Sequence, residues 1–130
     1  MPFRVIQPPS DREQFTEEGK RLYTAGKALG VPLEPEGFLH SWVSGTRVVV
    51  EEVDGEVVGF VLLAVGQRWT HSDATASALV LETKGDYDGL VEFLKQICAA
   101  LGAAELFIQN RAVRREGDLN YYTVVGHLLG

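Results

Sequence analysis

The stretch LETKGDYDGLVEFL, residues 81–94, carries residue types and a spacing that proteins use to hold a phosphate. An apolar run leads into a short turn with Gly85 and Gly89, and an amphipathic run follows. Backbone N–H groups at a helix start favour an anion, and glycines let it approach without a Cβ in the way. The same turn also carries Asp86 and Asp88, whose charges repel a phosphate. The stretch therefore predicts the shape of a phosphate site with charges of the wrong sign.

A pair of adjacent carboxylates, Glu51 and Glu52, offers a second kind of chemistry. Carboxylates are among the side chains that can act as general bases. Because side chains alternate along a strand, we expect the two to face opposite sides of a sheet. The alternative for both residues is a solvated charge at the edge of a strand.

The remaining reactive side chains predict little chemistry of their own. Cys98 shares a helical face with Leu94 and Leu101, so we expect a buried structural thiol. The three histidines stand far apart without metal-ligand spacing, so no metal site is expected.

One basic cluster and one tryptophan are candidates for contacts with a partner. The cluster consists of Arg111, Arg114 and Arg115, which could meet a phosphate or an acidic surface on another chain. A solvated loop is the alternative for these arginines. Trp69 is a loop anchor or a contact residue.

These side chains must be positioned by alternating strands and helices. The pattern predicts strands near 3–6, 76–82 and 104–109, and helices near 10–29, 37–45 and 88–101. Two β-rich runs joined by Asp54 and Gly55 predict a hairpin with a type I′ turn, and Gly59 predicts a bulge or close approach. On the first helix, Gly19 and Gly26 lie on the apolar face, which suggests that another backbone packs closely there. We expect Gly30 to end this helix. Near the C-terminus, Asp118 is a plausible helix cap, whereas residues 121–125 are strand-prone. For 118–125 we expect a short helix, followed by HLLG as the stub of a final strand.

Bulk properties limit the class of protein. The chain has 130 residues, of which 45% are hydrophobic and 23% charged, so we expect a single domain spanning 1–130. A net charge of −6 disfavours nucleic acid as the main partner. No apolar run is long enough to span a membrane, and the N-terminus lacks the apolar core of a signal peptide. We expect a cytoplasmic or virion-associated protein.

The order of these elements resembles the GNAT superfamily of N-acetyltransferases across nearly the whole chain. DGEVVGF at 54–60 looks like that family's hairpin between its second and third strands. The strand, turn and helix of 76–101 stand where the family binds acetyl-CoA. Tyr122, with Gly126 and His127 after it, is similar to the family's late Tyr-x-x-x-Gly-Phe. The resemblance implies an α/β (α+β) fold with a mixed, mostly antiparallel central sheet and about four flanking helices. The family usually ends with two strands after the tyrosine helix, whereas here only HLLG remains, so we expect a truncated last strand.

The resemblance also implies site roles if the chain is an active enzyme. Tyr122 would protonate the departing thiolate, and Glu51 or Glu52 would take the proton of the amine. The residues that would hold acetyl-CoA are Lys84, Gly85, Gly89 and Leu90. However, the family's pyrophosphate loop reads Gln/Arg-x-x-Gly-x-Gly/Ala, and here Tyr87 stands at the central glycine.

Two functions therefore stay open. The first, which we favour, is a degenerate GNAT-like domain that binds no cofactor and serves as a structural, assembly or binding component. Its partner would be another protein chain or a homo-oligomer, and similar short proteins occur in tailed bacteriophages, some of them as virion components. The alternative is an active acetyl-CoA-dependent N-acetyltransferase that acts on a small-molecule or protein amine.

Overall fold

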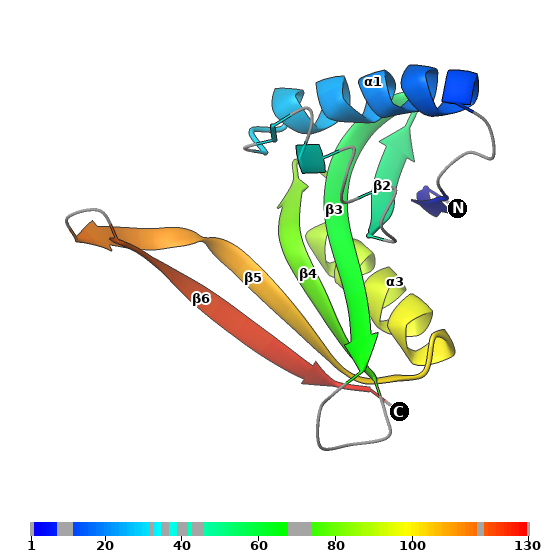
Figure 1. The fold of residues 1–130 in the computed structure, drawn as a ribbon. Coiled ribbons are helices and arrows are strands. Elements are labelled where there is room, and N and C mark those ends of the chain that lie inside the picture. The colour runs from blue at the N-terminus through cyan, green and yellow to red at the C-terminus, as the bar shows by residue number, and fades with distance from the viewer. Residues whose placement is uncertain are drawn as a thin grey trace.

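The structure is a computed structural model that describes residues 2–7, 12–31, 33–34, 37–38, 42, 46–67, 74–116 and 119–129. Within these residues, six strands form a twisted sheet, and two helices cover it, one on each face (Figure 1). In chain order the elements are β1 (Phe3–Ile6), α1 (Arg12–Ala28), β2 (Arg47–Val53), β3 (Glu56–Gln67), β4 (Ala74–Thr83), α3 (Tyr87–Ala100), β5 (Ala103–Glu116) and β6 (Leu119–Leu128).

The strands lie side by side in sequence order, from β1 at one edge to β6 at the other. All neighbouring pairs are antiparallel except β4 and β5, which are parallel and are connected through α3. A parallel pair needs a crossover, and the helix supplies it. The predicted α+β class with a mostly antiparallel sheet is confirmed.

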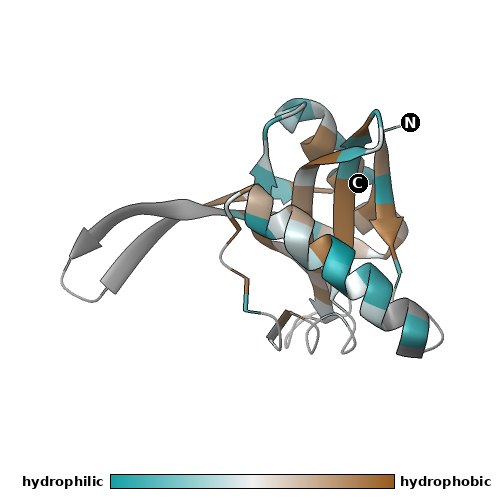
Figure 2. Ribbon diagram, turned by 90° about the horizontal axis from the view of Figure 1, so that it is seen from above, coloured by the Kyte–Doolittle hydropathy of each residue, from teal (hydrophilic) through white to brown (hydrophobic). Residues whose placement is uncertain are grey.

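The sheet separates two hydrophobic clusters. On the face of α3, buried side chains of that helix, among them Leu90 and Leu94, pack against the middle strands. On the face of α1, Leu22 packs with Phe60 and with the fully buried Trp42. Figure 2 shows hydrophilic residues along α1 above predominantly hydrophobic strands, as expected for a helix with one buried side.

The predicted hairpin between β2 and β3 is confirmed. Asp54 and Gly55 both have positive φ, at 53° and 78°, as a type I′ turn requires. Beyond the turn the register shifts, so that Glu51 pairs with Gly59 while Glu52 pairs with Val57. This bulge confirms the prediction at Gly59, and it matters for the site described below.

The backbone approach expected at Gly26 of α1 is not found among the described residues, because the atoms that pack closely against it belong to side chains. A Cβ at this position would come within 2.7 Å of Leu33 Cδ1 and 3.3 Å of Phe60 Cζ. The predicted end of the first helix near Gly30 is confirmed, because α1 ends at Ala28 and Gly30 has φ of 89°.

β4 and β5 pair over part of their length and then diverge (Figure 1). Their parallel pairing covers Ala74–Ala78 and Ala103–Ile108. Beyond that point β5 pairs with β6 as far as Glu116 opposite Leu119. The end of β4 next to α3 is therefore separated from β5.

The C-terminal part corrects the sequence prediction. Residues 118–125 were expected to form a helix before a stub of strand, but 119–128 form one ten-residue strand, β6, so the last strand is not truncated to HLLG. The run from Tyr121 to Val125 is aromatic and β-branched, and pairing with β5 allows that intrinsic preference to decide. The structure gives bounds for two helices rather than about four. Of the helix expected at 37–45, only Gly37, Phe38 and Trp42 are described, and they are helical.

We predict that Leu94→Ala lowers the free energy of unfolding by about 2–5 kcal/mol, because it leaves a cavity in a fully buried position of α3. Chemical denaturation followed by circular dichroism measures the change. Leu101→Ala is the matched control: this leucine caps the same helix and is 39% exposed, so we expect a change within about 0.5 kcal/mol. Equal losses in the two variants would contradict the assigned core.

Candidate functional site

The turn between β4 and α3 is held by its own side chains. Asp86 is the N-cap of α3, and its carboxylate accepts the N–H of Gly89 at 3.0 Å. The N–H of Gly85 donates to the hydroxyl of Thr83 at 2.9 Å. Asp88 adds a second carboxylate in the first turn. Negative side chains at the positive end of a helix stabilise it, and here the chain itself supplies both the cap and the charge.

A third carboxylate lies beneath this turn. Glu51 reaches it from β2 and is 4% exposed, the one buried charged residue among those the structure describes. Its carboxylate accepts the N–H of Asp86, at 3.1 Å to Oε1 and 3.4 Å to Oε2. The hydroxyl of Thr83 lies 3.4 Å from Oε1. A buried carboxylate needs such donors, and here a backbone N–H of the turn provides one.

The glycines around the turn make room for these carboxylates. A Cβ at Gly85 would collide with the carboxylate of Glu51, and one at Gly59 would lie 3.1 Å from Glu51 Cβ. A Cβ at Gly89 would collide with the carboxylate of Asp86 and lie 3.0 Å from the ring of Phe3. The spacing of Gly85 and Gly89, which in the sequence predicts a phosphate site, is therefore explained by the space that the carboxylates of Glu51 and Asp86 need.

The turn does not fit the pyrophosphate of acetyl-CoA. The N–H groups of Gly85, Asp86 and Gly89 all donate to acceptors within the chain. An incoming phosphate would also meet the charges of Glu51, Asp86 and Asp88. Repulsion between like charges close together costs on the order of 1 kcal/mol or more per pair, whereas a helix end favours an anion by about 0.3–1 kcal/mol. The repulsion outweighs the attraction.

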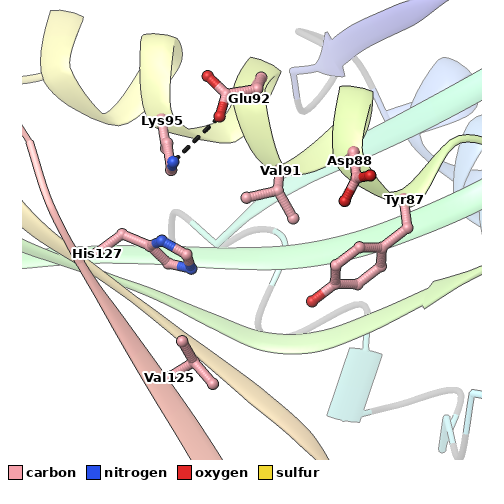
Figure 3. A pocket seen from close by; sticks show the side chains of 7 residues that line it. All are labelled: Tyr87, Asp88, Val91, Glu92, Lys95, Val125 and His127. Atoms are coloured by element: carbon pink, nitrogen blue, oxygen red, sulfur yellow. Dashed lines mark hydrogen bonds and ion pairs between the residues drawn. The ribbon is translucent and has the colours of Figure 1, made fainter.

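A shallow hollow of about 310 Å³ lies beside the turn, between α3 and β6 (Figure 3). Tyr87 projects from the start of α3 toward the sheet, while Val125 and His127 come from β6. Lys95 and Glu92 form an ion pair of 3.1 Å on its wall. Tyr87 is 46% exposed, so its side chain lines this hollow and is not part of the core.

Glu52 lies on the other side of the sheet, as strand alternation predicts. It pairs with Arg4 at 2.6 Å and with Arg21 of α1 at 3.4 Å. The hydrogen bond from Arg4, assisted by Arg21, lowers the pKa of the Glu52 carboxyl below its ordinary value. Both partners keep it ionised as part of a surface network that joins β1, β2 and α1.

The other predicted site residues are dispersed. Lys84 pairs with Glu56 at 3.0 Å, on the hairpin, and both side chains are largely exposed. Tyr122 lies in β6 opposite Ala112, in a strand and not in the expected helix. Leu90 is fully buried in the core of α3. The structure therefore brings Glu51 to the turn and does not bring Glu52 there.

The predicted partner contacts fall on parts of the chain for which side chains are not described. The backbone of Arg111, Arg114 and Arg115 lies in β5, and their side chains are outside the described residues. Trp69 is also outside the described residues. Their roles stay predictions.

Cys98 is buried on α3, as predicted. Burial raises the pKa of its thiol to about 11, against a smaller opposing effect of the positive charge of Arg47. The thiolate is the reactive form, so this position favours an inert structural thiol. No helix among the described residues is both long and apolar enough to cross a membrane.

Comparison with known proteins relates the chain to acetyltransferases by shape. No protein-family model matches the sequence, and the comparison with curated proteins finds no match. An aminoglycoside acetyltransferase from an uncultured soil metagenomic sample, in complex with trehalose, has a TM-score of 0.65 at 14% identity, covering 95% of each chain. A ribosomal-protein-alanine N-acetyltransferase from Brucella melitensis biovar Abortus 2308 has a TM-score of 0.63 at 13% identity, covering 93% of this chain and 95% of that one.

An acetyltransferase of the GNAT family from Streptococcus pneumoniae has a TM-score of 0.60 at 10% identity and covers 98% of each chain. At this level of identity the likeness concerns the fold. The GNAT-like fold that the sequence motifs predict is therefore confirmed.

We predict that Gly85→Ala lowers the free energy of unfolding by about 1–3 kcal/mol, because the added methyl group displaces the Glu51 carboxylate. Denaturant titration measures the loss. Gly66→Ala is the matched control, since a Cβ there meets nothing within 4 Å and the φ of Gly66 is not positive.

A double-mutant cycle with Glu51→Ala tests the cause of that loss. Glu51→Ala alone leaves the Asp86 N–H without its acceptor and should cost about 1–3 kcal/mol. With Glu51 shortened, Gly85→Ala should cost less, giving a coupling energy of about 0.5–3 kcal/mol. Additive losses would mean that the two residues do not meet.

We predict that Cys98 in the native protein reacts with iodoacetamide at mildly alkaline pH on the order of a hundredfold more slowly than in the unfolded chain, because its raised pKa leaves little thiolate. Mass spectrometry of timed samples, with and without denaturant, measures both rates. Equal rates would contradict the buried thiol.

Proposed function

We propose that this chain is a GNAT-fold domain that does not use acetyl-CoA and serves as a binding or assembly component. One observation carries the proposal: the buried Glu51 carboxylate accepts the Asp86 N–H at the start of α3. A phosphate at this turn would need that same region of the backbone. The chain supplies its own anion there.

Three further features support the same conclusion. Asp86 and Asp88 place negative charge at the helix start. Gly85 and Gly89 are both adjacent to carboxylates of the chain, so a phosphate is not needed to explain them. The position of Tyr87 beside the hollow adds a ring where the family has a glycine. A place in the virion of a tailed bacteriophage remains a prediction from the sequence resemblance.

Acetyl transfer to an amine is the second candidate function. It is favoured by the likeness in fold to acetyltransferases over more than nine-tenths of the chain. Under this alternative, acetyl-CoA would have to bind with its phosphates away from the turn, because the turn does not fit them. Glu51 would then be a structural residue and not the base.

Isothermal titration calorimetry with acetyl-CoA tests the proposal. We expect no binding heat up to millimolar cofactor. Binding at micromolar concentration would overturn the proposal and favour acetyl transfer. A thermal-shift series with the same cofactor is the companion measurement, because a ligand that binds the native state raises the melting temperature.

The triple variant Glu51→Gln, Asp86→Asn, Asp88→Asn sharpens the test, because it removes three charges at nearly constant shape, and asparagine remains a good N-cap. If these charges exclude phosphate, the variant gains affinity for acetyl-CoA that the wild type lacks. The triple Glu13→Gln, Glu17→Gln, Glu18→Gln changes charge equally on α1, away from the turn, and is the control. A gain of affinity in the control as well would contradict the role assigned to the turn.

A further inference from the structure

We propose that β6 is the surface through which two copies of this chain pair edge to edge about a two-fold axis. The inference rests on the proposed function and names its partner: a second copy of the chain. It concerns the strand that ends the sheet, on the side opposite β1 (Figure 1).

The outer edge of β6 offers backbone groups in a regular row. The N–H of Leu129 donates to the carbonyl of Ala104 at 3.0 Å, which makes these two residues a hydrogen-bonded pair. Antiparallel residues alternate between pairs that bond each other and pairs that do not. The register is unbroken from residue 129 back to 124, so Leu129, His127 and Val125 are in hydrogen-bonded pairs with β5. The N–H and C=O groups of the residues between them point away from β5. The backbone groups directed outward are those of Val124, Gly126 and Leu128.

The side chains at these outward positions are apolar and exposed. Val124 is 56% exposed and Leu128 is 88% exposed. They lie on the same face of β6, because they are separated by an even number of residues. Large apolar side chains exposed along a free strand edge mark a contact surface.

The two edges of the sheet differ in how they resist pairing. Edge strands are commonly protected by short length, charged side chains or proline. β1 has four residues, contains Arg4 and is followed in sequence by Pro8 and Pro9. β6 has ten residues, LNYYTVVGHL, and contains no proline, lysine, arginine, aspartate or glutamate. The protection found at β1 is thus missing at β6.

A second copy fits this edge better than an arbitrary partner. Two chains with a net charge of −6 repel each other over most of their surfaces, but an uncharged strand lets them meet without like charges in contact. We place the two Gly126 residues opposite each other at the two-fold axis, which is the register centred on Gly126. Val124 of each copy then lies opposite Leu128 of the other. A two-fold contact must be self-complementary in this way.

Analytical ultracentrifugation of the full 130-residue chain, from low to high micromolar concentration, tests the inference. Val124→Lys with Leu128→Lys places like charges opposite each other at both cross-strand pairs. Val124→Lys with Leu128→Glu places opposite charges there, in the same register. Val53→Lys with Leu79→Lys is the matched control, since these residues are 46% and 47% exposed and lie in β2 and β4, which β5 separates from β6. Circular dichroism checks that each variant is folded.

We expect the wild type and the control to dimerise with equal affinity. The double-lysine variant should dimerise on the order of a hundredfold more weakly, and the lysine–glutamate variant should recover most of the loss. A wild type that stays monomeric, or a double-lysine variant that pairs as the wild type does, would overturn the inference. Weakening by both charged variants would overturn the register centred on Gly126. Because calorimetry with acetyl-CoA is independent of this assay, a monomer that binds no cofactor would remove the pairing and leave the proposed loss of the cofactor site intact.

Discussion

The hydrogen bond from the Asp86 backbone to the buried Glu51 carboxylate is the constraint around which the centre of this molecule is arranged. A carboxylate can be buried only where donors meet it and where neighbouring chains leave it space. The bulge in the hairpin places Gly59 opposite Glu51, and Gly85 lies on its other side. The start of α3 is therefore fixed from below by β2 and from within by its own cap.

Local signals predicted most of the fold. The Asp54–Gly55 turn, the apolar periodicity of 88–101 and the glycine at position 30 each act over a few residues, so the sequence alone reveals them. The C-terminal strand was missed because a cap-like aspartate at 118 was given more weight than the strand preference of Tyr121–Val125. Pairing with β5, which a local pattern does not display, decides between the two.

The sequence predicted the turn of the candidate site but not the contact that holds it in place. The turn, its charges and Tyr87 are visible in the sequence, whereas the contact of Glu51 with the turn is not. Continued from the two-residue turn without a shift, the hairpin register would place Glu51 opposite Val58. The bulge moves it opposite Gly59, and only the folded sheet brings it under residue 86, thirty-five positions away. Contacts at such separation depend on register, which sequence patterns specify weakly.

The glycines beside the carboxylates have a consequence for how this chain could evolve. Placing a bound anion at the turn would require losing the negative charge of Glu51, yet removing that side chain alone leaves a cavity between two glycines and an unpaired N–H. Replacing either glycine alone meets the carboxylate. Because these changes are coupled, we expect truncation of Glu51 and a Cβ at either glycine to cost more stability singly than their combination would suggest. The exchange Glu51→Gln is the single step that avoids this coupling, since it removes the charge at nearly constant shape and leaves an oxygen to accept the Asp86 N–H.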